Sequence, residues 1–219
     1  MSQVSILIPV YNREKYIDET INSIYRSTFK DFEIIIYDDG STDKTRDIIR
    51  KYNVKLLEGN VNRGIGFARQ SLLNAFQTPY ACWLDSDDIM HEDRLEKQLS
   101  FLKQNKLDIC YTGIKNFSFN INNIVQTVDA EIERYTTDIK SFRANTTCAT
   151  GMFTSKAKLI RFNSDLKCGE DVTWLYNMFM AEYRIGYLKE YLYYYRQENE
   201  DRLTIKRRKG LLGDINYGK

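Results

Sequence analysis

Short apolar runs alternate with segments of helical periodicity through the first half of the chain. Between the first two runs, Ile17, Ile21 and Ile24 recur every three or four residues and predict one apolar helix face. The runs have the length of buried strands and occupy residues 4–10, 32–37, 54–57 and 80–84. Alternation of strands and helices predicts a mainly parallel sheet with right-handed crossovers.

The second half is less regular. Leu95, Leu99 and Leu102 predict a helix after residue 88, and residues 172–179 predict a late helix. The remaining β-prone stretches are a strand at 108–113, a hairpin or excursion at 114–130 and an aromatic run at 191–195. We therefore predict an α/β fold, Rossmann-like, with a mainly parallel sheet flanked by helices and a small antiparallel excursion.

We expect one domain over residues 1–205 and a basic tail over 206–219. The 219 residues include 32 basic and 30 acidic ones, a balance that gives no argument for nucleic-acid binding. The cluster at 206–209 is either a solvated tail or a contact with an anionic membrane surface. We see neither a signal peptide nor a transmembrane helix, and the four cysteines lack metal-type spacing. These features predict a cytoplasmic protein, with peripheral membrane contact as an option.

The strand predicted at 80–84 runs directly into Asp85-Ser86-Asp87-Asp88. The carboxyl ends of parallel strands form the edge at which open α/β sheets bind ligands. Carboxylates there suit Mg²⁺ or Mn²⁺, which are commonly shared with substrate phosphates. The simpler alternative is that these acidic residues solvate a turn.

Other polar groups follow at the same predicted edge. Asp39 comes after the second strand and could accept the imide N–H of uracil or thymine, or form an ordinary Asx-type turn. Arg69 lies inside the helix after Gly64, where it could brace Asp85 or approach a diphosphate.

Glu170 and Asp171 open the late helix. Acidic residues in a first turn are stabilised by the helix dipole and need no catalytic role. A carboxylate at this place could instead take a proton from an attacking hydroxyl.

Taken in order, the motifs resemble those of family 2 glycosyltransferases, which are inverting enzymes of the GT-A fold. The matching segments cover the chain through about residue 204 and lie at 6–12, 37–43, 62–69, 84–88 and 169–171. The resemblance implies a nucleotide-sugar-binding half at about 1–113 and an acceptor half at about 114–205. It also implies transfer of a sugar by a single in-line displacement at the anomeric carbon, aided by Mn²⁺ or Mg²⁺.

The resemblance further implies a role for each matching residue. Asp171 is the expected general base, Asp87 the principal metal ligand, and Asp85 either a ribose contact or a second metal ligand. The expected donor site comprises Pro9, Tyr11, Asn12, Asp39, Arg69, Asp85, Ser86 and Asp87. The expected acceptor site comprises Asp88, Glu170 and Trp174.

One segment departs from the family pattern. Many relatives have Tyr-Arg-x-His late in the chain, whereas this chain has Glu198 in place of the histidine. Glu198 is therefore either an oxygen ligand of the metal or no ligand at all. Arg196 is expected to steady the diphosphate or to form a plain salt bridge, and His91, the sole histidine, to have a surface or capping role.

The implied partners are a UDP- or dTDP-linked sugar donor and a hydroxyl of a glycan or lipid-linked acceptor. Two other classes deserve comparison. A sugar nucleotidyltransferase usually has a glycine-rich basic loop after its first strand, which residues 11–15 lack. A catalytically silent nucleotide-sugar-binding module would bind donor without turnover.

Overall fold

The computed structural model describes residues 2–129, 131–134, 143–145, 148–166 and 169–198. Among these, the N-terminal half forms a parallel sheet in the order β3-β2-β1-β4. Its strands are β1 (Val4–Val10), β2 (Phe32–Asp38), β3 (Lys55–Glu58) and β4 (Tyr80–Trp83). The connecting helices are α1 (Ile17–Tyr25), α2 (Thr45–Ile49) and α3 (Ile65–Ala75). The predicted strand–helix alternation is confirmed here.

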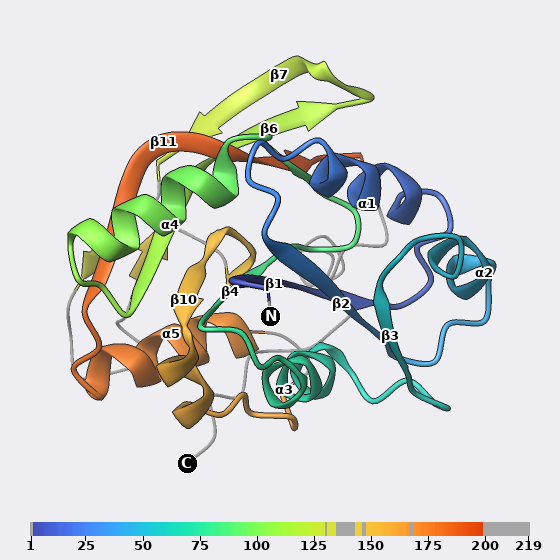
Figure 1. Ribbon diagram of the computed structural model, residues 1–219, viewed down its shortest axis with the longest axis horizontal. Coiled ribbons are helices and arrows are strands. Elements are labelled where there is room, and N and C mark those ends of the chain that lie inside the picture. Colours follow the sequence, from blue (N-terminus) through green and yellow to red (C-terminus); the bar gives the residue numbers. More distant parts are fainter. Residues whose placement is uncertain (1, 130, 135–142, 146–147, 167–168, 199–219) are drawn as a thin grey trace.

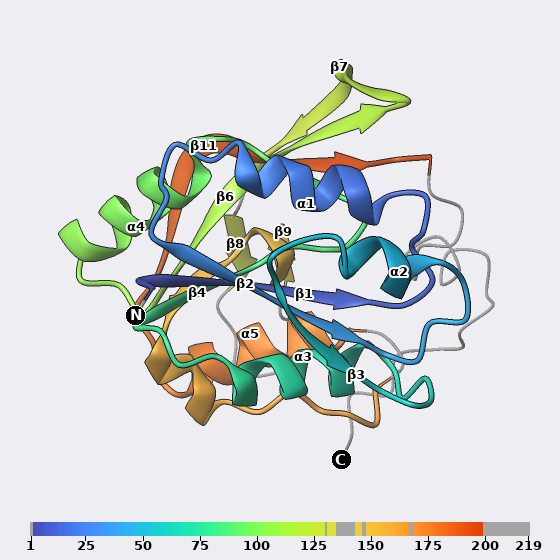
Figure 2. The same cartoon turned by 45° about the vertical axis from the view of Figure 1, so that its right-hand side comes forward.

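Helices cover both faces of the sheet, as Figures 1 and 2 show, with α1 and α4 (Arg94–Gln104) on one side and α3 and α5 (Glu170–Met180) on the other. The alternation of side chains along β1 explains this arrangement. Ile6 and Ile8 lie in the core beneath α1 and α4, whereas Leu7 lies in the core beneath α3 and α5. The continuous apolar run of β1 is thus the sequence of a strand that is buried on both faces.

The second half turns the sheet from parallel to mixed. Its strand order continues from β4 as β10-β6-β11-β5, and β7 pairs with β6. These strands are β5 (Ile89–Met90), β6 (Ile109–Ser118), β7 (Asn120–Val128), β10 (Met152–Thr154) and β11 (Ile185–Arg196). β10 is antiparallel to both β4 and β6, while β6 and β11 are parallel. The predicted α/β fold is confirmed, with the parallel part confined to the first strands and the β6–β11 pair.

The remaining elements are short. β8 (Glu131–Arg134) and β9 (Arg143–Asn145) pair in a separate sheet, and 3₁₀ turns η1 (Cys148–Thr150) and η2 (Ser155–Leu159) flank β10. The β6–β7 pair is the predicted excursion, and it projects from the body of the fold in Figure 2. Its first strand extends well past residue 113, where the sequence pattern placed its end.

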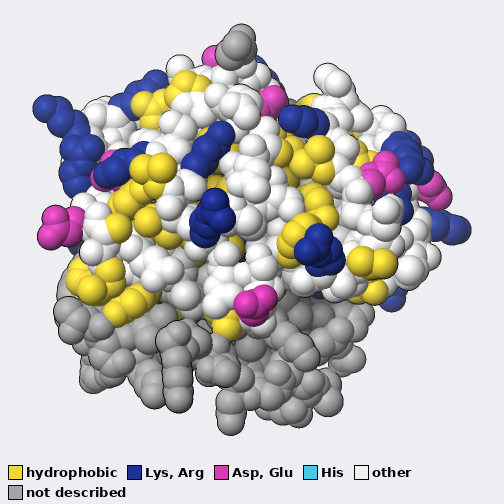
Figure 3. All heavy atoms as spheres, turned by 90° about the horizontal axis from the view of Figure 1, so that it is seen from below, with side chains coloured by type: hydrophobic (Ala, Val, Ile, Leu, Met, Phe, Trp, Pro, Cys, Tyr) yellow, Lys and Arg dark blue, Asp and Glu magenta, His cyan; other side chains and the backbone are white. Residues whose placement is uncertain are grey.

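Two surface features bear on the sequence-based expectations. None of the described helices has the length and apolar character needed to span a bilayer. Figure 3 looks onto the side of α3 and α5, where the described basic side chains are interspersed with apolar ones rather than gathered in one patch. Cys82 and Cys110 are buried free thiols; the basic tail, the Cys148 side chain and Cys168 lie outside the described residues.

Candidate active site at the carboxyl edge of the sheet

The predicted site residues follow the carboxyl ends of adjacent parallel strands. β1 pairs with β2 so that Val10 lies opposite Asp38, and β1 pairs with β4 so that Leu7 lies opposite Trp83. The segments that leave these strands therefore meet at one sheet edge, as expected for an open α/β fold.

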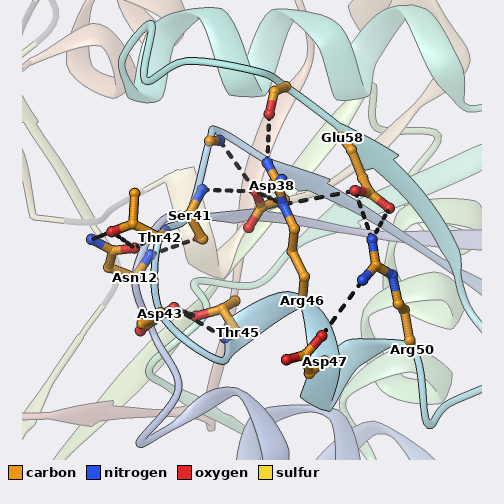
Figure 4. Close-up of polar contacts among 12 residues, drawn as sticks. Asn12, Asp38, Ser41, Thr42, Asp43, Thr45, Arg46, Asp47, Arg50 and Glu58 are labelled. Carbon is orange, nitrogen blue, oxygen red and sulfur yellow. Dashed lines mark hydrogen bonds and ion pairs between the residues drawn. The ribbon is translucent and has the colours of Figure 1, made fainter.

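The exits of β1 and β2 are joined by polar contacts (Figure 4). Asn12 Oδ1 accepts the N–H of Thr42 at 2.8 Å, and the N–H of Asn12 donates to Ser41 Oγ at 2.9 Å. Behind them, buried Asp38 accepts the N–H of Ser41 at 2.9 Å and the Nε–H of Arg46 at 2.7 Å. Arg46 also donates to the carbonyl of Gly59, so this cluster fixes the turn that presents Asp39.

Asp39 is buried, and its carboxylate accepts the backbone N–H groups of Arg63 and Gly64 at 2.7–3.0 Å. Burial raises the pKa of Asp39, and these N–H groups oppose that shift. The carboxylate thus holds the loop before α3, where Gly64 has a φ of 95° that favours glycine. A carboxylate has about four lone-pair sites, so these bonds leave room for a base contact.

Pro9 and Tyr11 differ in their exposure. Pro9 is buried within β1 opposite Tyr37, whereas Tyr11 is 38% exposed beside the strand end. Tyr11 is thus the residue of this pair that offers ring surface to a ligand.

The turn of residues 85–88 is closed by the N–H of Asp88, which donates to the carbonyl of Asp85 at 3.2 Å. Asp85 keeps 27% side-chain exposure, whereas Ser86 and Asp87 are buried. Asp87 Oδ2 lies 3.4 Å from Nε of Arg13, a residue that the sequence patterns did not single out.

Asp88 was expected to face the sugar or acceptor, but it lies inside the protein. The residue is 0% exposed. Its Oδ2 accepts the hydroxyl of Tyr193 at 2.7 Å, and its Oδ1 accepts the N–H of Arg196 at 3.0 Å. The side chain thus points toward β11, because that strand supplies the donors that a buried carboxylate needs.

Arg69 braces Asp85, one of the two alternatives that its position suggested. Its Nη2 lies 3.1 Å from Asp85 Oδ1, and its Nη1 lies 3.5 Å from Glu170 Oε1. The guanidinium also lies against the rings of Trp83 and Phe162. Arg69 therefore connects the 85–88 turn to the start of α5.

Glu170 and Asp171 differ in environment although they are neighbours in sequence. Glu170 is 5% exposed, and burial raises its pKa to about 7, with Asp171 adding to the rise and Arg69 opposing it. Asp171 is half-buried, and its Oδ1 accepts the N–H of Val172 at 2.9 Å. Asp171 is thus the carboxylate of the pair with surface open to a substrate.

Trp174 does not have the exposure that acceptor contact requires. Its side chain is 0% exposed, stacks on Phe162 with centroids 4.9 Å apart, and donates its Nε1–H to the carbonyl of Ile160. The helical spacing places it one turn after Glu170, on the face of α5 that packs against the sheet. Trp174 therefore supports the wall of the site from inside.

Arg196 and Glu198 form a salt bridge, one of the two alternatives expected for Arg196. Arg196 is buried, donates its Nε–H to the carbonyl of Asp87 at 2.9 Å, and pairs with Glu19 and Glu198. Its guanidinium is thus engaged within the protein, where it anchors the peptide of Asp87. Glu198 Oε1 accepts the N–H of Phe119 at 2.8 Å and lies 3.4 Å from Nη1 of Arg196.

The described residues contain no group of three His, Cys, Asp or Glu side chains that could hold a metal ion. Asp85 and Asp87 remain a pair of carboxylates in one turn, and Glu198 does not join them. Two carboxylates fit Mg²⁺ or Mn²⁺ chemistry, because such ions take their other ligands from phosphates and water. His91 has the local role expected: its Nδ1 accepts the N–H of Asp93 at 3.1 Å just before α4.

Comparison with known proteins places this geometry in context. The sequence matches the family described as "Glycosyl transferase family 2" over residues 5–167. It is 30% identical over 211 residues to the poly(ribitol-phosphate) beta-N-acetylglucosaminyltransferase TarS of Staphylococcus aureus strain Mu50, covering 91% of this chain and 36% of that protein. It is also 30% identical over 210 residues to a poly(ribitol-phosphate) beta-glucosyltransferase of Bacillus spizizenii, covering 88% of this chain and 32% of that protein.

Solved structures of other proteins are also similar to this chain. The crystal structure of S. aureus TarS 1–349 in complex with UDP-GlcNAc is similar with a TM-score of 0.72 and 26% identity, over 93% of this chain and 61% of that one. A mannosyltransferase from Pyrobaculum calidifontis shares the fold with a TM-score of 0.72 at 16% identity, over 95% of this chain and 61% of that one. The chain spans about a third of the length of the curated relatives named above. With its GT-A fold and its family match over most of its length, the chain belongs to glycosyl transferase family 2.

Proposed function

We propose that this chain transfers a sugar from a nucleoside-diphosphate donor, with a UDP-sugar favoured over a dTDP-sugar, to a hydroxyl of a glycan or lipid-linked acceptor. The relative TarS has been crystallised with UDP and with UDP-GlcNAc. TarS and the Bacillus enzyme are both named for transfer to poly(ribitol-phosphate). These relatives support a UDP-linked donor and a polyhydroxylated acceptor for the present chain.

The observation that carries the proposal is the double contact of Arg69 with Asp85 and Glu170. Asp85 belongs to the expected donor site, and Glu170 neighbours the expected general base. A single buried cation that contacts both supports one site in which a donor and an acceptor lie side by side. Such positioning is a large part of the rate enhancement in a two-substrate reaction.

On the donor side, Tyr11 and Asp39 would contact the base, with Pro9 and Asn12 shaping the strand end behind them. Arg69, Ser86 and Asp85 would support the nucleoside side. Asp87, with Asp85 as a second or water-mediated ligand, would hold Mn²⁺ or Mg²⁺, whose charge stabilises the departing nucleoside diphosphate when bound. Arg13, which already lies 3.4 Å from Asp87, would add a further positive charge near the diphosphate.

On the acceptor side, Asp171 would take the proton of the attacking hydroxyl. The acceptor oxygen then forms the bond to the anomeric carbon as the bond to the diphosphate oxygen breaks, with inversion at that carbon. Glu170, which is buried and paired with Arg69, would line the acceptor pocket and fix the start of α5. The greater exposure of Asp171 supports its assignment as the base.

The proposal is tested by calorimetric titration of the protein with UDP, GDP, dTDP and CDP, each with manganese and with chelator. We expect metal-dependent binding of UDP or dTDP that is weakened by Asp87→Ala. Binding that is identical in chelator would remove the role of Asp87. Donor binding without turnover across many acceptors would favour a silent nucleotide-sugar-binding module.

A separate experiment concerns the basic cluster at residues 206–209. Binding of the protein to vesicles of anionic lipid would test peripheral membrane contact through this cluster.

A further inference from the structure

The 85–88 turn is held by hydrogen bonds from β11. The hydroxyl of Tyr193 accepts the N–H of Asp85 at 3.2 Å and donates to Asp88 Oδ2 at 2.7 Å. A tyrosine hydroxyl has one proton to donate and lone pairs to accept, so it can make both bonds at once. Tyr193 thereby joins the first and last residues of the turn across more than a hundred residues of sequence.

The neighbouring strand pairing explains why Tyr193 reaches the turn. β5, which follows directly after Asp88, pairs antiparallel with β11 so that Met90 lies opposite Tyr193. The Tyr193 ring is 0% exposed, and the guanidinium of Arg94 lies 5.2 Å from its centroid. Its hydroxyl is therefore held in one place by packing on the ring.

Asp88 makes a second connection between the 85–88 turn and β11. Its second carboxylate oxygen accepts the N–H of Arg196, and the Arg196 side chain donates to the carbonyl of Asp87. Thr20 on α1 contacts the same turn, because its Oγ1 lies 2.8 Å from the carbonyl of Asp88 and 3.2 Å from that of Ser86. The backbone on both sides of Asp87 is thus fixed by β11 and α1, which lie on the same side of the fold in Figures 1 and 2.

We propose that Tyr193 and Asp88 are positioning residues, which hold the 85–88 turn so that Asp85 and Asp87 keep the orientation needed to bind a divalent cation together with the donor. This inference rests on the proposed function, because it needs those two carboxylates to be the metal ligands. Tyr193 and Asp88 are both 0% exposed, so neither offers surface to a substrate. They act through the hydrogen bonds that orient the ligating residues, as the partners of metal ligands do in other metal sites.

The test is Tyr193→Phe, which removes the hydroxyl and keeps the ring. We expect the manganese concentration needed for half-maximal UDP binding to rise about 10-fold or more, since loss of such partners typically costs 10–100-fold in metal affinity. UDP affinity in chelator should fall by much less than this, because the base contacts expected from Tyr11 and Asp39 lie outside the 85–88 turn.

The matched control is Tyr191→Phe on the same strand. It also removes a tyrosine hydroxyl that donates to an aspartate, here to Asp129 Oδ1 at 2.9 Å, but at an exposed place away from the turn. We expect wild-type manganese dependence in this variant. A role of Tyr193 in stability alone would lower the melting temperature of Tyr193→Phe and leave its manganese dependence like that of the control, which would overturn the inference.

Thr20→Val provides a second route if Tyr193→Phe does not fold. It removes the hydrogen bonds from α1 to the same turn and keeps the shape of the side chain, so it should raise the manganese requirement in the same way. An unchanged manganese requirement in Thr20→Val would contradict the inference. Wild-type protein that binds UDP equally with manganese and with chelator would instead refute the metal role in the proposed function, and the positioning role with it.

Discussion

Nη1 of Arg69 lies 3.5 Å from Oε1 of Glu170, and both side chains are almost completely buried. The same guanidinium contacts Asp85 at 3.1 Å. A buried cation between two carboxylates offsets the cost of burying either charge alone, and its removal leaves that cost uncompensated. The pairing therefore has consequences for stability as well as for the geometry of the site.

Arg69→Ala is expected to lower the free energy of unfolding at pH 8 by about 3–5 kcal/mol, the usual cost of breaking a buried ion pair. Chemical denaturation of wild type and variant measures this difference in the free energy of unfolding. The matched control is Arg50→Ala, because Arg50 is 54% exposed and pairs with Glu58 at the surface. The control should change stability by less than about 1 kcal/mol. Equal effects of the two substitutions would show that the Arg69 pair has no special energetic role.

Glu170 gives the stability a defined pH dependence. Its folded-state pKa of about 7 is above the ordinary value of 4.5, so the folded protein holds a proton that the unfolded chain releases. This stabilising contribution is fully present below pH 4.5 and is lost as the pH rises through about 7. Over that interval it amounts to about 3 kcal/mol as an order of magnitude.

Glu170→Gln removes this proton equilibrium. Denaturation of wild type and variant at intervals from pH 5 to about pH 8 should show the wild type losing stability relative to the variant as the pH rises. Asp39, whose pKa is also raised, is present in both proteins and its contribution cancels in the comparison. Parallel curves for the two proteins would contradict a raised pKa at Glu170.

Sequence reasoning predicted the first strands and the helices because their periodicity is local. β10 has three residues and β5 has two, which is too short for a periodic pattern, and both are stabilised by neighbours far away in sequence. The insertion of β10, antiparallel to both β4 and β6, separates the parallel strands of the first half from the parallel β6–β11 pair. No pattern within the strand itself indicates that insertion.

For the site, the sequence predicted which residues lie near one another but not which way their side chains point. The order of the motifs predicted that Asp39, Asp85 and Asp171 lie in one region, because each of them follows a strand end or opens a helix. It did not give the direction of side chains such as Asp88 and Trp174, which point inward to partners on β11 and in the apolar core. Those directions depend on tertiary packing.

Asp171→Asn tests the assignment of the base. We expect kcat to fall by about 10²–10⁴-fold, since the amide cannot take the acceptor proton, while the calorimetric affinity for the donor nucleotide stays unchanged. Glu170→Gln is the matched comparison, because the two carboxylates are adjacent and undergo the same chemical change. A pKa of about 7 would also suit a general base at neutral pH, so exposure rather than acidity separates the two residues. If Glu170→Gln loses the larger part of kcat and Asp171→Asn keeps most of it, the base is Glu170, and Asp171 serves to raise the pKa of its neighbour.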